Sequence, residues 1–151
     1  MYQRILAPVD GSDTSARGLH EAIRLARGNR STLRFIHVVT GRIYDHAYDS
    51  EQYKSNYINA LRSDGMEILS RANRLSAEQG VASEDVMVDA IGEPAAGWIV
   101  TQSKEWEADL IVMGTHGRRG FRRTELGADA EEVLRAAAVP VLLIRGFVLG
   151  A

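Results

Sequence analysis

The chain has 151 residues, no cysteine and a formal net charge of -2, with 45% hydrophobic and 25% charged residues. This length and balance predict one globular domain over residues 1–151, and the lack of cysteine excludes disulfides, thiolate metal sites and thiol catalysis. Because there is no strong positive charge and no apolar run of about 18 residues, we expect neither general nucleic-acid binding nor a membrane span, and we expect a cytoplasmic protein.

Short apolar runs alternate with longer stretches of helical periodicity. The first run, residues 5–9, ends at a polar turn over residues 10–13, and apolar residues then recur at helical spacing as far as Gly28. A second apolar run covers residues 33–39. Both runs are apolar on both faces, which is typical of parallel strands covered by helices.

The remaining elements continue this alternation. They are predicted as a polar, tyrosine-rich loop over residues 40–52, a long helix that ends at Gly80, a strand over 86–91, a helix that opens at Pro94, a strand over 110–113, a helix over 128–137 and a strand over 141–145. Tyr57, Leu61 and Ala72 mark one face of the long helix. Five strands alternating with four helices predict an α/β fold, in which a five-stranded parallel sheet carries helices on both faces.

Ligands of such sheets bind beyond the carboxyl ends of the strands, where the strand order reverses. Three segments with suitable chemistry lie at predicted carboxyl ends: residues 8–11, 38–39 and 113–117. This coincidence predicts a ligand site formed by segments that are far apart in the sequence.

The most informative motif follows the strand at residues 110–113. Two residues separate Gly114 from Gly117, and nine residues separate Gly117 from Gly127, which precedes the last helix. A strand that runs into a glycine-rich turn and a helix start can cradle phosphate, because glycine lets the backbone approach an anion and free N–H groups supply positive potential. The alternative is that these glycines only turn the chain.

Each charged residue that could face this loop has two interpretations. Asp10, at the end of the first strand, could accept hydrogen bonds from ribose hydroxyls or bind a metal, or it could be a turn residue with Ser12 as the helix cap. Arg118 and Arg119 adjoin Gly117 and could contact phosphate, or they could belong to a solvated face.

The histidines do not form a site by their spacing. His20, His37 and His46 are predicted to be structural, whereas His116 could lie over a phosphate. Because Ser12 has no evident histidine and acid partners, nucleophilic catalysis is unsupported and no catalytic residue is assigned. Any ATP hydrolysis is expected to be slow, since no general base is identifiable near the loop.

These residues together resemble the universal stress protein family over residues 4–145. The similar segments are RILAPVDGS at residues 4–12, HVV at 37–39, ADLIVMGTHGR at 108–118 and VPVLLIR at 139–145. The resemblance implies an adenine nucleotide alpha hydrolase-like, Rossmann-like sandwich. It also implies a homodimer that pairs through the last strand, from Val141 to Arg145.

The resemblance further implies a dimeric regulator of the stress response that binds ATP, ADP or AMP, with Mg²⁺ carried by the nucleotide. By position, the residues that would contact the nucleotide are Pro8, Asp10, Val38, Met113, Gly114, His116, Gly117, Gly127, Ala128 and Asp129, and Arg118 joins them beside Gly117.

One position departs from the family's nucleotide-binding pattern. Ala128 stands where binding members have Ser or Thr, and a missing hydroxyl removes one hydrogen bond of about 0.5–1.5 kcal/mol, or up to about 3 kcal/mol when charge-assisted. We expect weakened binding, with a shift toward ADP or AMP. The alternatives are a nucleotide-free family member that acts through dimerisation and protein interactions, and an ATP-consuming enzyme of a related fold.

Overall fold

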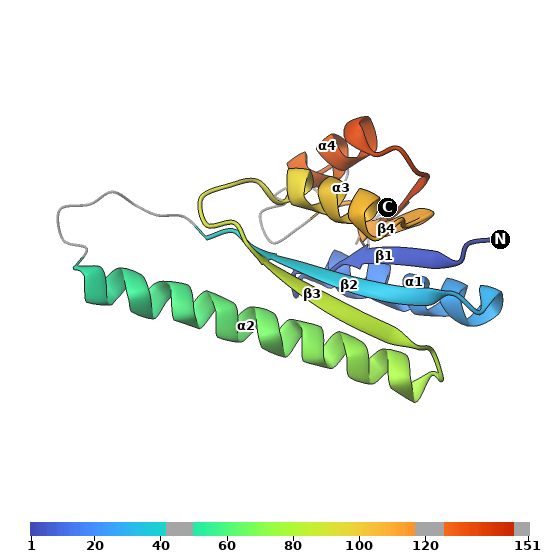
Figure 1. Ribbon diagram of the computed structural model, residues 1–151, viewed down its shortest axis with the longest axis horizontal. Coiled ribbons are helices and arrows are strands. Elements are labelled where there is room, and N and C mark those ends of the chain that lie inside the picture. The colour runs from blue at the N-terminus through green and yellow to red at the C-terminus, as the bar shows by residue number, and fades with distance from the viewer. Residues whose placement is uncertain (42–49, 117–125, 147–151) are drawn as a thin grey trace, which may run out of the picture.

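The computed structural model describes residues 1–41, 50–116 and 126–146. In these ranges, strands and helices alternate along the chain as predicted (Figure 1). The elements are β1 (Arg4–Pro8), α1 (Asp13–Asn29), β2 (Thr32–Val39), α2 (Glu51–Glu78), β3 (Ser83–Asp89), α3 (Ala95–Glu105), β4 (Leu110–Gly114), α4 (Ala128–Ala136) and β5 (Val141–Ile144).

The strands form one parallel sheet in the order β3-β2-β1-β4-β5, which confirms the predicted sheet. The chain first builds outward from β1 through β2 to β3, and then crosses back to place β4 on the other side of β1. The strand order therefore reverses between β1 and β4, and a ligand site is expected beyond their carboxyl ends.

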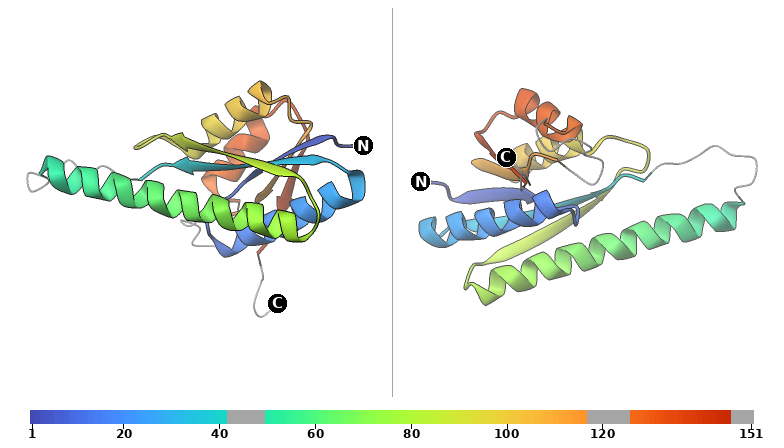
Figure 2. Two further views of the ribbon diagram at one scale, coloured as in Figure 1. Left: turned by 60° about the horizontal axis from the view of Figure 1, so that its bottom comes forward. Right: turned by 180° about the vertical axis from the view of Figure 1, so that it is seen from behind.

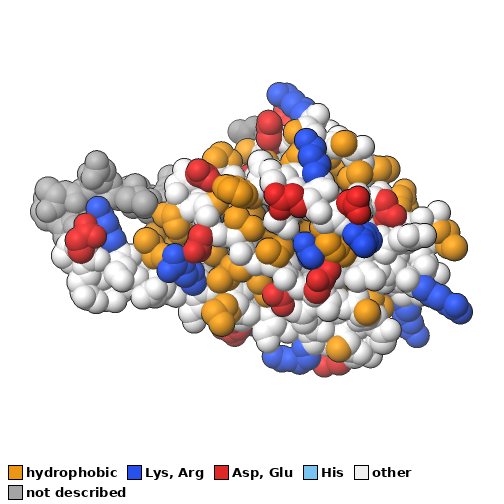
Figure 3. Space-filling model, in the orientation of Figure 1, with side chains coloured by type: hydrophobic (Ala, Val, Ile, Leu, Met, Phe, Trp, Pro, Cys, Tyr) orange, Lys and Arg blue, Asp and Glu red, His pale blue; other side chains and the backbone are white. Residues whose placement is uncertain are grey.

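Helices cover both faces of the sheet (Figure 2). Alternate residues of a strand point to opposite faces, so Ile5 packs with α1 and α2 while Leu6 packs with α3 and α4. Within the described ranges, every helix is too short or too polar to cross a bilayer. On the side seen in Figure 3, acidic and basic side chains of the described residues are interspersed, so this side carries no broad field of one sign.

The predicted third strand is shifted in the structure. The sequence predicts a strand over residues 86–91, whereas β3 begins at Ser83 and ends at Asp89. Its first three residues are polar, and they still pair with β2 from Leu33↔Ser83 onward. Because β3 is an edge strand, its polar side chains reach water while its backbone pairs, and hydropathy alone misses this part.

The first turn of α1 crosses the end of β4 at main-chain distance. A Cβ at Gly114 would lie 2.7 Å from Thr14 C and 2.8 Å from Thr14 O, and a Cβ at Gly18 would lie 3.1 Å from Gly114 N. The Thr14 hydroxyl also donates a hydrogen bond to the His116 carbonyl. Gly114 therefore has a packing role, in addition to the ligand role that its motif suggests.

Gly114→Ala is expected to lower the free energy of unfolding by about 1–3 kcal/mol, because the new methyl group meets backbone that cannot rotate away. Urea unfolding followed by circular dichroism measures this. The matched control is Gly28→Ala in α1, where a Cβ meets nothing within 4 Å. The control should be neutral or stabilise by up to about 1 kcal/mol. Equal midpoints for wild type and Gly114→Ala would contradict the packing role.

Candidate functional site

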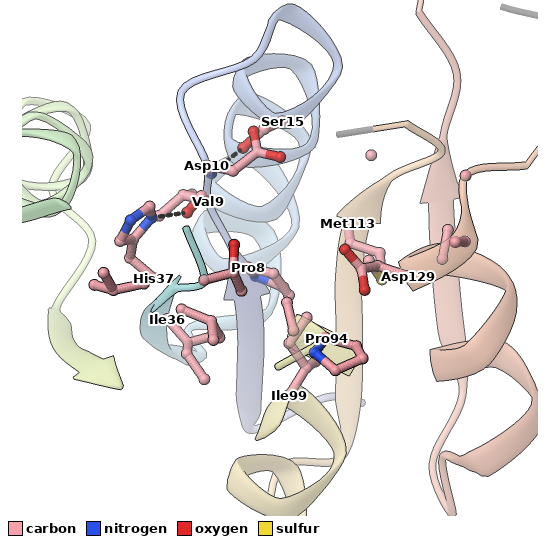
Figure 4. A pocket seen from close by; sticks show the side chains of 18 of the residues that line it. Pro8, Val9, Asp10, Ser15, Ile36, His37, Pro94, Ile99, Met113 and Asp129 are labelled. Atoms are coloured by element: carbon pink, nitrogen blue, oxygen red, sulfur yellow. Dashed lines mark hydrogen bonds between the residues drawn. The ribbon is translucent and has the colours of Figure 1, made fainter. Parts of the chain in front are cut away.

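A cavity of about 750 Å³ opens beyond the carboxyl ends of β1 and β4 (Figure 4). It is lined by the ends of these strands, the end of β2, the starts of α3 and α4, and one face of α2. All described residues of the predicted site line it: Pro8, Asp10, Val38, Met113, Gly114, His116, Gly127, Ala128 and Asp129. Gly117 and Arg118 lie outside the described residues.

Asp10 takes part in a turn and also lines the cavity. Its backbone N–H donates to Ser15 Oγ at 3.0 Å, and its Oδ1 accepts from the Ser12 N–H at 2.8 Å. Ser12 caps α1, since its hydroxyl accepts from the Ser15 N–H at 3.2 Å. The turn uses Oδ1 only, so Oδ2 has no partner among the described residues and can accept from a ligand hydroxyl.

Thr115 ties the end of β4 to its surroundings. Its N–H donates to the Ile144 carbonyl at 2.9 Å, and its own carbonyl accepts from Gly127 N–H at 2.7 Å. Its hydroxyl lies 2.9 Å from His116 Nδ1, while His116 Nε2 is buried with no partner in the described part of the chain. The positions of Gly127 and His116 at the cavity are thus held by hydrogen bonds to one residue.

The start of α4 faces the cavity with main-chain donors. Gly127 is the N-cap, at φ -66° and ψ 157°. Among the described residues, no side chain caps this helix start by a hydrogen bond. The first helical bond runs from Glu131 N–H to the Gly127 carbonyl, so the N–H groups of Ala128 and Asp129 precede the helical pattern. Such a helix start attracts an anion, although the Asp129 carboxylate repels one.

The charged groups that line the cavity are acidic. They are Asp10, Asp64, Glu93 and Asp129, and no lysine or arginine joins them among the described residues. Within the same ranges, no three side chains gather as metal ligands would. Among the described residues, a phosphate would therefore meet main-chain N–H groups and hydroxyls such as those of Ser15 and Thr115, but no lysine or arginine. The carboxylates suit hydroxyl or amine donors.

The contribution of α2 to the cavity was not predicted from the sequence. Tyr57, Leu61 and Asp64 line the cavity, and the first two belong to the helix face that the sequence marks. Their four-residue spacing predicts a shared face, but it does not say what that face meets. His37, expected to be structural, is hydrogen-bonded to Val9 and also lines the cavity.

Comparisons with known proteins agree on one family. A family model described as the universal stress protein family matches residues 1–145. The chain is 32% identical over 151 residues to universal stress protein YxiE of Bacillus subtilis, which covers 96% of this chain and 100% of that protein.

Two solved structures extend this comparison. A protein from the universal stress protein family from Burkholderia pseudomallei has a TM-score of 0.78 and 31% identity, over 96% of this chain and 97% of that one. The universal stress protein from Archaeoglobus fulgidus in complex with dAMP has a TM-score of 0.68 and 24% identity, over 95% of this chain and 98% of that one. The second likeness shows a shared fold.

Ser15→Ala is expected to lower the free energy of unfolding by about 1–3 kcal/mol, because it leaves the Asp10 N–H without its acceptor in a partly buried turn. Chemical denaturation measures the change. Ser103→Ala is the matched control, since this serine is equally buried but only donates to a carbonyl inside α3. If both variants lose the same stability, the turn at Asp10 does not depend on Ser15.

Proposed function

The chain belongs to the universal stress protein family, and we propose that it binds an adenine nucleotide in the cavity beyond β1 and β4. The observation that carries the proposal is the meeting of nine predicted contact residues, from separate segments, at one cavity where the strand order reverses. The relative solved with dAMP supports an adenine nucleotide as the ligand.

We further propose that the protein prefers AMP or ADP to ATP. The α4 start offers main-chain N–H groups for one phosphate, whereas Ala128 offers no hydroxyl and Asp129 adds a negative charge. Each further phosphate adds negative charge beside these groups, so its binding needs cations such as Mg²⁺ carried by the nucleotide. Hydrolysis is proposed to be slow at most, and the protein to act as a dimeric, cytoplasmic regulator of the stress response.

The direct test is to release bound ligand from freshly purified protein and identify it by mass spectrometry, and then to titrate ligand-free protein with AMP, ADP and ATP by calorimetry. An adenine nucleotide in the released fraction, with saturable heat, is the expected result. Protein that releases no adenine compound and gives no heat with any of the three would refute nucleotide binding.

Ala128→Ser is expected to tighten ATP binding by about threefold to tenfold, because the hydroxyl adds one hydrogen bond to a phosphate oxygen. AMP affinity should change less, since the added contact is proposed to lie at the distal phosphates. Calorimetric titration measures both. Ala136→Ser, exposed at the end of the same helix, is the control and should leave both affinities unchanged.

A nucleotide-free family member is the second candidate function. It is favoured by the four carboxylates around the cavity and by Ala128, which together oppose phosphate binding. For such a protein, the wild type would show no heat with nucleotides, and Ala128→Ser would create ATP affinity from an undetectable level. Function would then reside in dimerisation and protein contacts.

We also propose that β5 pairs with the same strand of a second copy. β5 lies at one edge of the sheet and reads VLLI, with Leu142 37% exposed. The opposite edge, β3, carries Glu84 and Asp89, which form ion pairs with Arg34 and Arg62. Charged edges resist strand addition and apolar edges favour it, so the contrast points to β5 as the pairing edge.

Leu142→Arg is expected to convert a dimer to a monomer, because a buried, unpaired charge would oppose pairing at this edge. Size-exclusion chromatography with light scattering measures the molar mass. Met66→Arg provides the control, since Met66 is 63% exposed on α2, which packs against β2 and β3, and β3 is the edge strand opposite β5. A dimer that persists in Leu142→Arg contradicts the proposed interface.

A further inference from the structure

We propose that His37 is a positioning residue of the cavity: its ring ends the pairing of β1 with β2 and thereby leaves the main chain of Val38 open to a ligand. The role toward a nucleotide rests on the proposed function. The geometry of β1, β2 and the His37 ring involves described residues only.

β1 and β2 separate at a defined point. Their parallel register ends at Pro8↔Ile36, and the last main-chain bond between them runs from Val9 N–H to the Ile36 carbonyl, at 2.9 Å. In a continuing parallel ladder, the Val38 N–H would donate to the Val9 carbonyl next. Instead, His37 Nδ1 lies 2.8 Å from that carbonyl oxygen (Figure 4). Since a carbonyl only accepts, Nδ1 carries the proton and donates.

The consequence falls on Val38. Main-chain groups alternate in direction along a strand, so Val38 points its N–H and carbonyl to the same side as Ile36, toward β1. The Ile36 carbonyl accepts from the Val9 N–H on that side. Val38 lies past the point where the two strands separate, and it lines the cavity. One donor and one acceptor are thereby directed at the site. The His37 side chain occupies the Val9 carbonyl that the Val38 N–H would otherwise meet.

Gly65 of α2 makes room for the ring. A Cβ at residue 65 would lie 2.6 Å from His37 Cδ2, 3.0 Å from His37 Nε2 and 3.0 Å from Met87 Sδ. His37 is only 7% exposed, so most of its surface is in contact with the protein. Gly65 is also the first buried residue along α2, where the helix meets the sheet. The packing of α2 therefore holds the ring against Val9.

The test compares His37→Ala with His37→Asn. Alanine removes the donor, so we expect the Val9 carbonyl to accept from Val38 N–H and AMP affinity to fall by at least about tenfold. Asparagine restores a donor, because its amide nitrogen stands as many bonds from Cα as Nδ1 does. Its AMP affinity should return to within about threefold of wild type. Hydrogen exchange of the Val38 amide, measured without ligand, should slow in His37→Ala only.

A second pair of variants tests the same contact if His37→Ala does not fold. Gly65→Ala should displace the ring and lower AMP affinity as His37→Ala does. Gly97→Ala is its matched control in α3, where a Cβ would meet nothing within 4 Å, and it should bind like wild type.

Two outcomes separate this inference from the proposed function. If wild-type protein binds no adenine nucleotide but the Val38 amide becomes protected in His37→Ala, nucleotide binding is wrong and the positioning role stands. If Val38 exchange stays at the wild-type rate in His37→Ala, or if alanine and asparagine lower affinity equally, His37 has no positioning role.

Discussion

The main-chain contact between α1 and the end of β4 determines where the cavity forms. Gly114 has no room for a side chain beside the first turn of α1, and Gly18 has little room beside Gly114. The contact brings the capped turn after β1 against the end of β4, although about a hundred residues separate them. Asp10 and His116 consequently line one cavity. In a doubly wound sheet this is the place where the strand order reverses, so helix packing and site formation depend on the same two glycines.

The electrostatics of the cavity limit what it can hold. A helix start stabilises a nearby anion by about 0.3–1 kcal/mol when exposed, and up to about 2 kcal/mol when partly buried. Hydrogen bonds from main-chain N–H groups to a charged phosphate add about 1.5–3 kcal/mol each. The nearby carboxylates of Asp10 and Asp129 act against both effects. Among the described residues, this balance fits a ligand with few phosphates and several hydroxyl or amine donors, which is the basis of the proposed preference for a nucleoside monophosphate.

The long helix α2 links the edge of the sheet to the cavity. Arg62 forms an ion pair with Asp89 of β3 at 2.8 Å, and Asn73 hydrogen-bonds Asp85 of the same strand. These polar contacts hold α2 along an edge strand that offers few apolar side chains. Exposed ion pairs contribute little stability, so the main value of these contacts is register. With the register held, Gly65 lies over His37, and the preceding turns contribute Tyr57 and Leu61 to the cavity wall.

The fold class, the order of the elements and the segments that end at the cavity could all be predicted from the amino-acid sequence. Apolar runs predict buried strands, and glycine motifs indicate that two stretches of backbone approach closely. Met113 and Gly114 could therefore be assigned to a ligand site from the sequence. The polar first residues of β3 were not predicted as strand, because an edge strand can pair through its main chain without apolar side chains. Three features could be seen only in the folded chain: α2 lines the cavity, Gly114 packs on Thr14, and His37 hydrogen-bonds the Val9 carbonyl. Each of these joins residues distant in sequence, and local periodicity carries no information on which distant surfaces meet.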